Sequence, residues 1–183
     1  LYEAIRKLCV IDIFVENDDD PQLIFESLNS TGLKLTEADM IRNFVLMGLE
    51  AKTQEEYYTR YWLAIEKNTN KTKTANFFRD YLTVKQGKIP AIRDVYFVFK
   101  KYAEDQDILP ILVELLKYSK IYNKILTSHT LCKDIDITLK RLNTLDMTVT
   151  YPFLLALFDY AHEVELPEED LINTLSCLET YIV

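Results

Sequence analysis

The sequence predicts a mainly α-helical, multi-helix bundle-like domain with one short β-strand near its amino end. Two features of the composition favour helices: only three glycines and five prolines occur in 183 residues, and 49% of the residues are hydrophobic. Turn-rich β architectures use more glycine and proline, and a chain of this length and hydrophobic content can bury a core. The third feature is the recurrence of apolar residues at helical spacing along most of the chain.

The elements can be placed along the chain from their residue patterns. Residues 1–7 are expected to close a helix, and residues 8–14, which are rich in β-branched and aromatic side chains, form the predicted strand. Beyond this strand, apolar spacing predicts helices at 21–29, 36–50, 54–67, 74–85, 91–104, 107–127, 131–142, 150–163 and 167–183.

Three of these helices carry recognisable starting signals. Thr36 is followed three residues later by Asp39, which predicts a reciprocal capping box. Thr53 stands before two glutamates as a candidate cap, and Pro167 precedes an acidic first turn that the helix dipole favours. The helix at 107–127 is apolar on nearly all sides, so it is expected to be central and buried.

The most specific stretch of the chain is residues 25–43, with the pattern F-E-x-L-N-x-x-G-x-x-L-x-x-x-D-x-I-R-N. It predicts the end of one helix, a turn relaxed by Gly32, and a new helix opening at Thr36. Two interpretations of the turn stay open. Asn29 and Gly32 can place donors beside a phosphate at the positive end of the new helix, or they can serve only to connect two helices.

This pattern resembles the one that closes the ParB/sulfiredoxin-like, nucleotide-dependent GmrS domain of GmrSD-type restriction proteins. The resemblance implies that Asn29, Ser30 and Gly32 form a loop near the nucleotide, supported by Asp39, Arg42 and Asn43. An ion pair between Asp39 and Arg42, three residues apart on one helix, fits this supporting role.

The family's Asp-Gly-Gln-Gln-Arg run, tied to nucleotide hydrolysis, is absent from the chain, as is its His-Asn-His nuclease motif. Because the first residue is Leu1, we expect an internal piece of a longer protein. The expected domains are a remnant of a truncated α/β core at 1–50 and a helical domain at 51–183. The catalytic residues, the nucleoside triphosphate and any divalent metal would belong to the longer protein, a nucleotide-dependent DNA endonuclease. The piece itself would be inactive and would bind no cofactor of its own.

The charge distribution suggests where DNA would bind. The chain carries a net charge of −8, which argues against general affinity for nucleic acid. Residues 67–101, however, hold nine basic residues against two acidic ones, so that segment is +7 and the remainder −15. Aromatic residues are interleaved with these cations, although their helical spacing favours core packing over base stacking. The candidate DNA-facing residues are Lys85, Lys88, Lys100 and Lys101. The alternatives are that this face meets an acidic partner or is only solvated.

Other classes of site have less support. Three cysteines without metal-like spacing favour reduced thiols in a cytoplasmic protein, and no apolar run is long enough to span a membrane. His129 and Cys132 lack two further metal ligands, and two histidines give little basis for a catalytic centre. The alternative function is a non-catalytic helical module that holds a partner helix in an apolar groove. The oligomeric state is not specified by the sequence.

Overall fold

The computed structural model describes residues 6–7, 24–27 and 35–182. The chain divides into two compact units, Leu1–Lys34 and Leu35–Val183. In the first unit, residues 24–27 are helical, inside the helix predicted at 21–29. The strand predicted at 8–14 lies outside the described residues.

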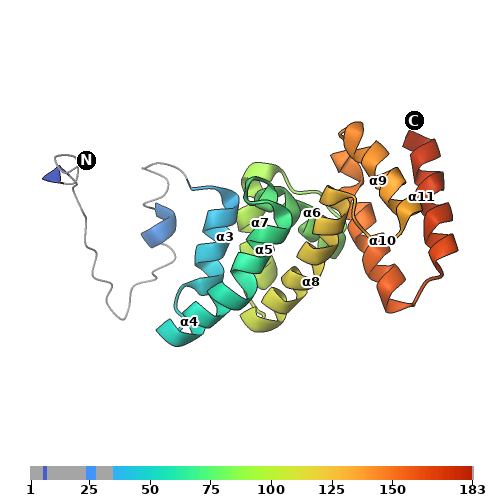
Figure 1. Ribbon diagram of the computed structural model, residues 1–183. Coiled ribbons are helices and arrows are strands. Elements are labelled where there is room, and N and C mark those ends of the chain that lie inside the picture. Colours follow the sequence, from blue (N-terminus) through green and yellow to red (C-terminus); the bar gives the residue numbers. More distant parts are fainter. Residues whose placement is uncertain (1–5, 8–23, 28–34, 183) are drawn as a thin grey trace. The chain divides into compact units, whose positions relative to one another are not determined.

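The described part of the second unit contains helices and turns but no strand, which confirms the mainly α class (Figure 1). Its longer helices correspond to those predicted from residue 36 onward. They are α3 (Glu37–Leu46), α4 (Ala51–Tyr57), α5 (Leu63–Thr69), α6 (Thr74–Gln86), α7 (Val95–Ala103), α8 (Ile108–Thr127), α9 (Lys133–Thr144), α10 (Tyr151–Glu163) and α11 (Glu168–Ile182). A π-helical turn joins α4 to α5 at Tyr58–Trp62, and 3-10 turns lie at Lys71–Lys73, Ile92–Asp94 and Thr148–Thr150.

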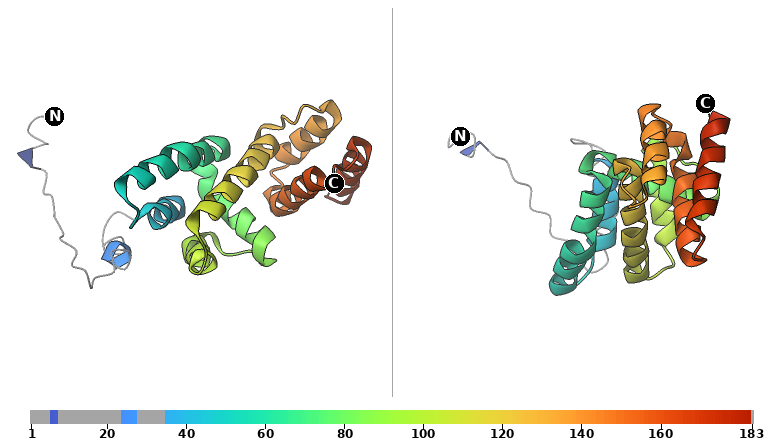
Figure 2. Two further views of the ribbon diagram at one scale, coloured as in Figure 1. Left: turned by 90° about the horizontal axis from the view of Figure 1, so that it is seen from below. Right: turned by 45° about the vertical axis from the view of Figure 1, so that its right-hand side comes forward.

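The helices of this unit run from α3 and α4 at one end of the bundle to α9, α10 and α11 at the other (Figures 1 and 2). α8 packs against α5 and against α10, and α10 also packs against α6. α3 packs on α7, and α11 packs on α9. The predicted central position of the 107–127 helix is therefore confirmed.

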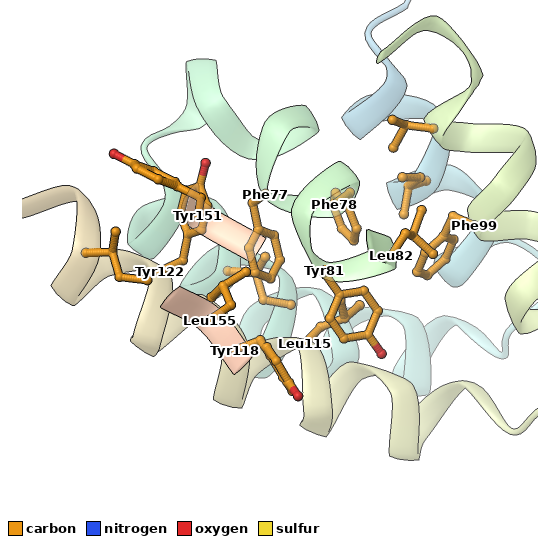
Figure 3. Packing of buried hydrophobic residues seen from close by; sticks show 14 of the residues in the cluster. Phe77, Phe78, Tyr81, Leu82, Phe99, Leu115, Tyr118, Tyr122, Tyr151 and Leu155 are labelled. Atoms are coloured by element: carbon orange, nitrogen blue, oxygen red, sulfur yellow. The ribbon is translucent and has the colours of Figure 1, made fainter. Parts of the chain in front are cut away.

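An aromatic core connects α6, α7, α8 and α10 (Figure 3), and Trp62 of the π-helical turn joins it. Phe77, Phe78 and Tyr81 on α6 are fully buried. The ring of Phe78 stacks on Trp62 at 5.7 Å between centroids, and Phe77 meets Tyr122 edge-on at 5.3 Å. Such pairs add to the free energy gained by burying the rings. The expectation that these aromatics pack in the core is confirmed for α6.

The boundary between the two compact units follows Lys34, and the expected division into a core remnant at 1–50 and a helical domain at 51–183 stays a prediction. α3 belongs to the helical unit, which begins at Leu35. The reason is that α3 buries its apolar face against α7: Ile41 is fully buried, and Phe44 meets Phe99 edge-on at 6.2 Å. The Glu37 carboxylate also accepts a hydrogen bond of 2.8 Å from the backbone N–H of Tyr96.

Two helices have ends that differ from the prediction. The helix expected at 36–50 stops at Leu46, because Met47 is extended, with φ −69° and ψ 143°, and Gly48 then adopts φ +78°, as in a tight turn. The next helix consequently starts earlier, at Ala51, and runs through the π-helical turn to Thr69. Thr53 thus lies within α4, and its predicted role as a cap is wrong; the N-cap residue is Glu50, which makes no side-chain capping bond.

Candidate functional site

The start of α3 has the predicted capping box. The backbone N–H of Asp39 donates to Thr36 Oγ1 at 3.1 Å, and the backbone N–H of Thr36 donates to Asp39 Oδ2 at 3.3 Å. The other carboxylate oxygen, Oδ1, pairs with Arg42 Nη2 at 3.2 Å. The predicted ion pair is therefore present, and Asp39 serves both the cap and Arg42.

Arg42 also connects α3 to α5. Its Nη1 lies 3.7 Å from Glu66 Oε1, the same oxygen to which the Trp62 indole N–H donates at 2.8 Å. With two carboxylates beside it, this guanidinium acts as a strut between helices. Asn43 is partly buried, and its side chain makes no hydrogen bond to the described residues, so its supporting role stays a prediction. The loop residues Asn29, Ser30 and Gly32 lie outside the described residues.

The turn between α6 and α7 shapes the best candidate site. α6 ends at Gly87, which has φ +66° and donates its N–H to Thr83 O at 2.9 Å. A left-handed glycine at this position stops the helix and turns the chain away. Lys88 and Ile89 follow at the surface, and Ile89 is 60% exposed. Pro90 follows in the same turn, and because proline has no backbone N–H to donate, it keeps a helix from continuing here.

A groove of about 690 Å³ lies between this turn and α7; we call it the α6–α7 groove. On the α7 side, residues three to four apart line it as one helix face. Lys88 and Lys101, two of the predicted DNA-facing residues, both belong to its wall, and neither makes a hydrogen bond or ion pair with a described residue. The lining is Gln86, Lys88, Ile89, Pro90, Ala91, Asp94, Phe97, Val98 and Lys101.

Phe97 distinguishes this groove from the rest of the basic segment. Its neighbours Tyr96 and Phe99 are fully buried, whereas Phe97 is 57% exposed on the groove wall. An aromatic face beside unpaired cations can take the face of a base or of another planar group. Asp94 is the one acidic residue of the lining, and its carboxylate lies 3.8 Å from the Arg93 guanidinium.

The other two predicted lysines lie elsewhere. Lys85 Nζ pairs with Glu114 Oε1 at 2.5 Å and sits over the ring of Tyr118 at 5.1 Å from its centroid. The Tyr81 hydroxyl donates to the same Glu114 carboxylate, and burial together with this hydrogen bond raises the pKa of Tyr81 well above its ordinary value. Lys85 therefore joins α6 to α8 and does not line the groove. Lys100 is partly buried on α7, also outside the lining.

Asp80, whose carboxyl has a raised pKa, was not predicted as a site residue from the sequence. It is 1% exposed, and its Oδ1 accepts hydrogen bonds of 3.0 Å from both Nε and Nη2 of Arg79. Its Oδ2 is buried and has no hydrogen-bond partner among the described residues. Burial raises the pKa of Asp80 to about 6, against the opposing effect of the Arg79 guanidinium. A charged residue within the aromatic run of α6 was the available signal.

Arg79 and Asp80 also line a small hollow of about 150 Å³ with Thr148, Val149 and Pro152. Ile89 belongs to the walls of both this hollow and the α6–α7 groove. The Arg79 guanidinium is thus near the groove but is held by Asp80.

The described ranges contain no group of three or more histidine, cysteine or acidic side chains placed to hold a metal ion. His129 Nδ1 lies 3.8 Å from Asp136, and Cys132 Sγ lies 3.2 Å from Glu168, so the two members of the proposed pair contact different acids. None of the described helices has the length and apolar character needed to cross a bilayer.

Comparisons with models of protein families, with curated proteins and with solved structures find no match to this chain.

Proposed function

We propose that this chain is part of a cytoplasmic, GmrSD-like, nucleotide-dependent DNA restriction protein and that the α6–α7 groove faces DNA. The observation that carries the DNA assignment is the pair of unpaired lysines, Lys88 and Lys101, on the wall of one open groove with exposed Phe97. The restriction assignment rests on the resemblance of residues 25–43 to the family pattern.

The groove fits a nucleic-acid backbone better than the rest of the surface does. A lysine can contact a phosphate only if its ammonium group is not already paired with a carboxylate of the protein. Lys88 and Lys101 meet this requirement, whereas Lys85 is already paired with Glu114. Since residues outside the basic segment sum to −15, they repel DNA and restrict contact to this side of the segment.

The nucleotide assignment concerns the loop at Asn29, Ser30 and Gly32. In the proposed arrangement the Asp39–Arg42–Glu66 contacts hold α3, which follows that loop, in a fixed orientation. The nucleoside triphosphate and divalent metal would bind to the longer protein with its catalytic residues. Residues 1–183 alone are expected to hydrolyse no nucleoside triphosphate, and turnover that Asn29→Ala abolishes would contradict this.

Charge reversal in the groove tests DNA binding. The double variant Lys88→Glu/Lys101→Glu of the full-length protein should bind a fluorescent DNA duplex at least about tenfold more weakly in an anisotropy titration, because two phosphate contacts are replaced by repulsion. Lys133→Glu/Lys140→Glu on α9 makes the same change of charge at two exposed positions outside the groove. Equal losses in the two double variants would show that net charge, not the groove, governs binding.

A second candidate function is a helical protein-interaction module. It is favoured by a separate groove between α8 and α10, whose floor is apolar and whose rim is basic. The two functions are compatible, because they use different surfaces of the same helical unit.

A further inference from the structure

The second groove, here called the α8–α10 groove, consists of two adjoining hollows of about 430 and 300 Å³. The hollows share Lys124, Phe158 and His162 on their walls, so they lie next to each other. Within the first hollow the floor is apolar, and one of its residues, Val113, is 49% exposed. The apolar residues of this hollow are Val113, Leu116, Ile121 and Phe158.

This groove exists because α8 is apolar on more sides than the bundle covers. Leu112 and Leu115 are fully buried against the neighbouring helices. Val113 and Leu116, one position further round the helix, are left at the surface beside α10. A contiguous apolar surface rimmed by polar residues is typical of a binding site for another protein.

The rim of the first hollow is basic, whereas the second hollow has Glu168 on its wall. Lys117, Lys120 and Lys124 follow at helical spacing and share one face of α8. Lys117 is held at 2.5 Å by Asp159 and at 3.2 Å by Glu163. The side chains of Lys120 and Lys124 make no hydrogen bond or ion pair with any described residue, so these two ammonium groups are free in the described part of the chain.

The basic residues at this groove stand out from an otherwise acidic part of the chain. Residues 108–182 contain 11 acidic residues and only six basic ones, yet three of the six line this one groove. The surrounding acidic surface would repel an acidic ligand placed elsewhere on the same helices.

We propose that the α8–α10 groove binds an acidic amphipathic helix of a partner protein. The apolar floor would receive one face of that helix, and Lys120 and Lys124 would pair with carboxylates along its flank. Val113 and Lys124 are 11 residues apart, which sets the floor at about 16 Å, or roughly three helical turns. A nucleic acid fits less well, because its phosphates and sugars gain nothing from an apolar floor.

The test uses a designed probe with the 183-residue chain. The probe is a fluorescent peptide of about four helical turns, with leucines along one face and glutamates on both flanks. We expect saturable binding that Lys120→Glu/Lys124→Glu weakens at least about tenfold. A matched peptide with lysines in place of the glutamates should bind this double variant more tightly than it binds the unmodified chain.

Two control variants separate the effects. Lys133→Glu/Lys140→Glu alters charge at exposed positions of α9 outside the groove and should leave the affinity for the acidic peptide unchanged. Val113→Glu places a charge on the apolar floor at an exposed position and should abolish binding while leaving the circular dichroism spectrum unchanged.

Several outcomes would overturn the proposal. These are the absence of saturable binding, an affinity that Lys120→Glu/Lys124→Glu does not change, and sedimentation showing that a second copy of this chain occupies the groove. Loss of DNA binding in this double variant, with peptide binding intact, would assign the rim to nucleic acid instead. Because Lys88→Glu/Lys101→Glu should affect DNA alone, failure of one proposal is distinguishable from failure of the other.

Discussion

Replacing Asp80 with asparagine is expected to stabilise the protein above pH 6. The carboxyl is 1% exposed, and burial raises its pKa from 3.8 to about 6. The folded state therefore holds the Asp80 proton more tightly than the unfolded chain does. The resulting contribution to stability is complete below the unfolded pKa and is lost as the pH rises through about 6.

The size of the effect follows from the shift in pKa. A shift of about two units corresponds to roughly 3 kcal/mol of unfolding free energy lost between pH 4 and 7. Asparagine carries no charge to desolvate and keeps an Oδ1 that accepts from Arg79, as the protonated carboxyl does. Because the pKa shift already includes the interaction of the carboxylate with Arg79, Asp80→Asn should gain about 3 kcal/mol at pH 8 and little or nothing at pH 4.

Urea unfolding followed by circular dichroism at pH 4, 6 and 8 measures this difference. Asp105→Asn, at an exposed position in the turn before α8, is the matched control for the loss of one carboxylate. The reasoning is refuted if Asp80→Asn is less stable than the unmodified chain at pH 8, or if the difference between them does not grow as the pH rises.

Three further substitutions test the fold by the same urea unfolding. Phe77→Ala removes a fully buried ring from the centre of the core and should lower the unfolding free energy by about 3–5 kcal/mol, whereas a loss below about 1 kcal/mol would show that the core is not packed as described. Thr36→Ala removes the oxygen that accepts from the Asp39 N–H and should cost about 1 kcal/mol, most of which Thr36→Ser should restore. Gly87→Ala meets no neighbouring atom but must adopt φ +66°, so a loss of about 1 kcal/mol is expected, and an unchanged stability would contradict the left-handed turn.

Most of the helical fold could be predicted because the apolar periodicity of a helix depends only on residues that are close together in the sequence. The helices predicted at 74–85 and 107–127 correspond to α6 (Thr74–Gln86) and α8 (Ile108–Thr127). The end of α3 was missed because apolar spacing continues past Leu46, while the backbone turns at Gly48. The turn at Met47 and Gly48 ends the helix there, although the apolar spacing alone predicts that it continues.

The candidate site was predictable only in part, because its geometry depends on contacts between distant residues. The sequence singled out four lysines of the basic segment but could not show that Lys85 pairs with Glu114, 29 residues away. Nor could spacing show that Phe97 is exposed while its neighbour Tyr96 is buried. The exposed positions of Lys120 and Lys124 beside an apolar groove were not predicted either, because the apolar helix at 107–127 was expected to be buried.

The salt dependence of DNA binding tests the proposed DNA-facing groove most directly. For the full-length protein, the logarithm of the association constant is plotted against the logarithm of the salt concentration, with and without Lys88→Ala/Lys101→Ala. If both lysines contact phosphates of duplex DNA, the slope should become shallower by about 1.8, or 0.9 for each lost contact. A slope that stays the same in the double variant would contradict a DNA-facing role for the α6–α7 groove.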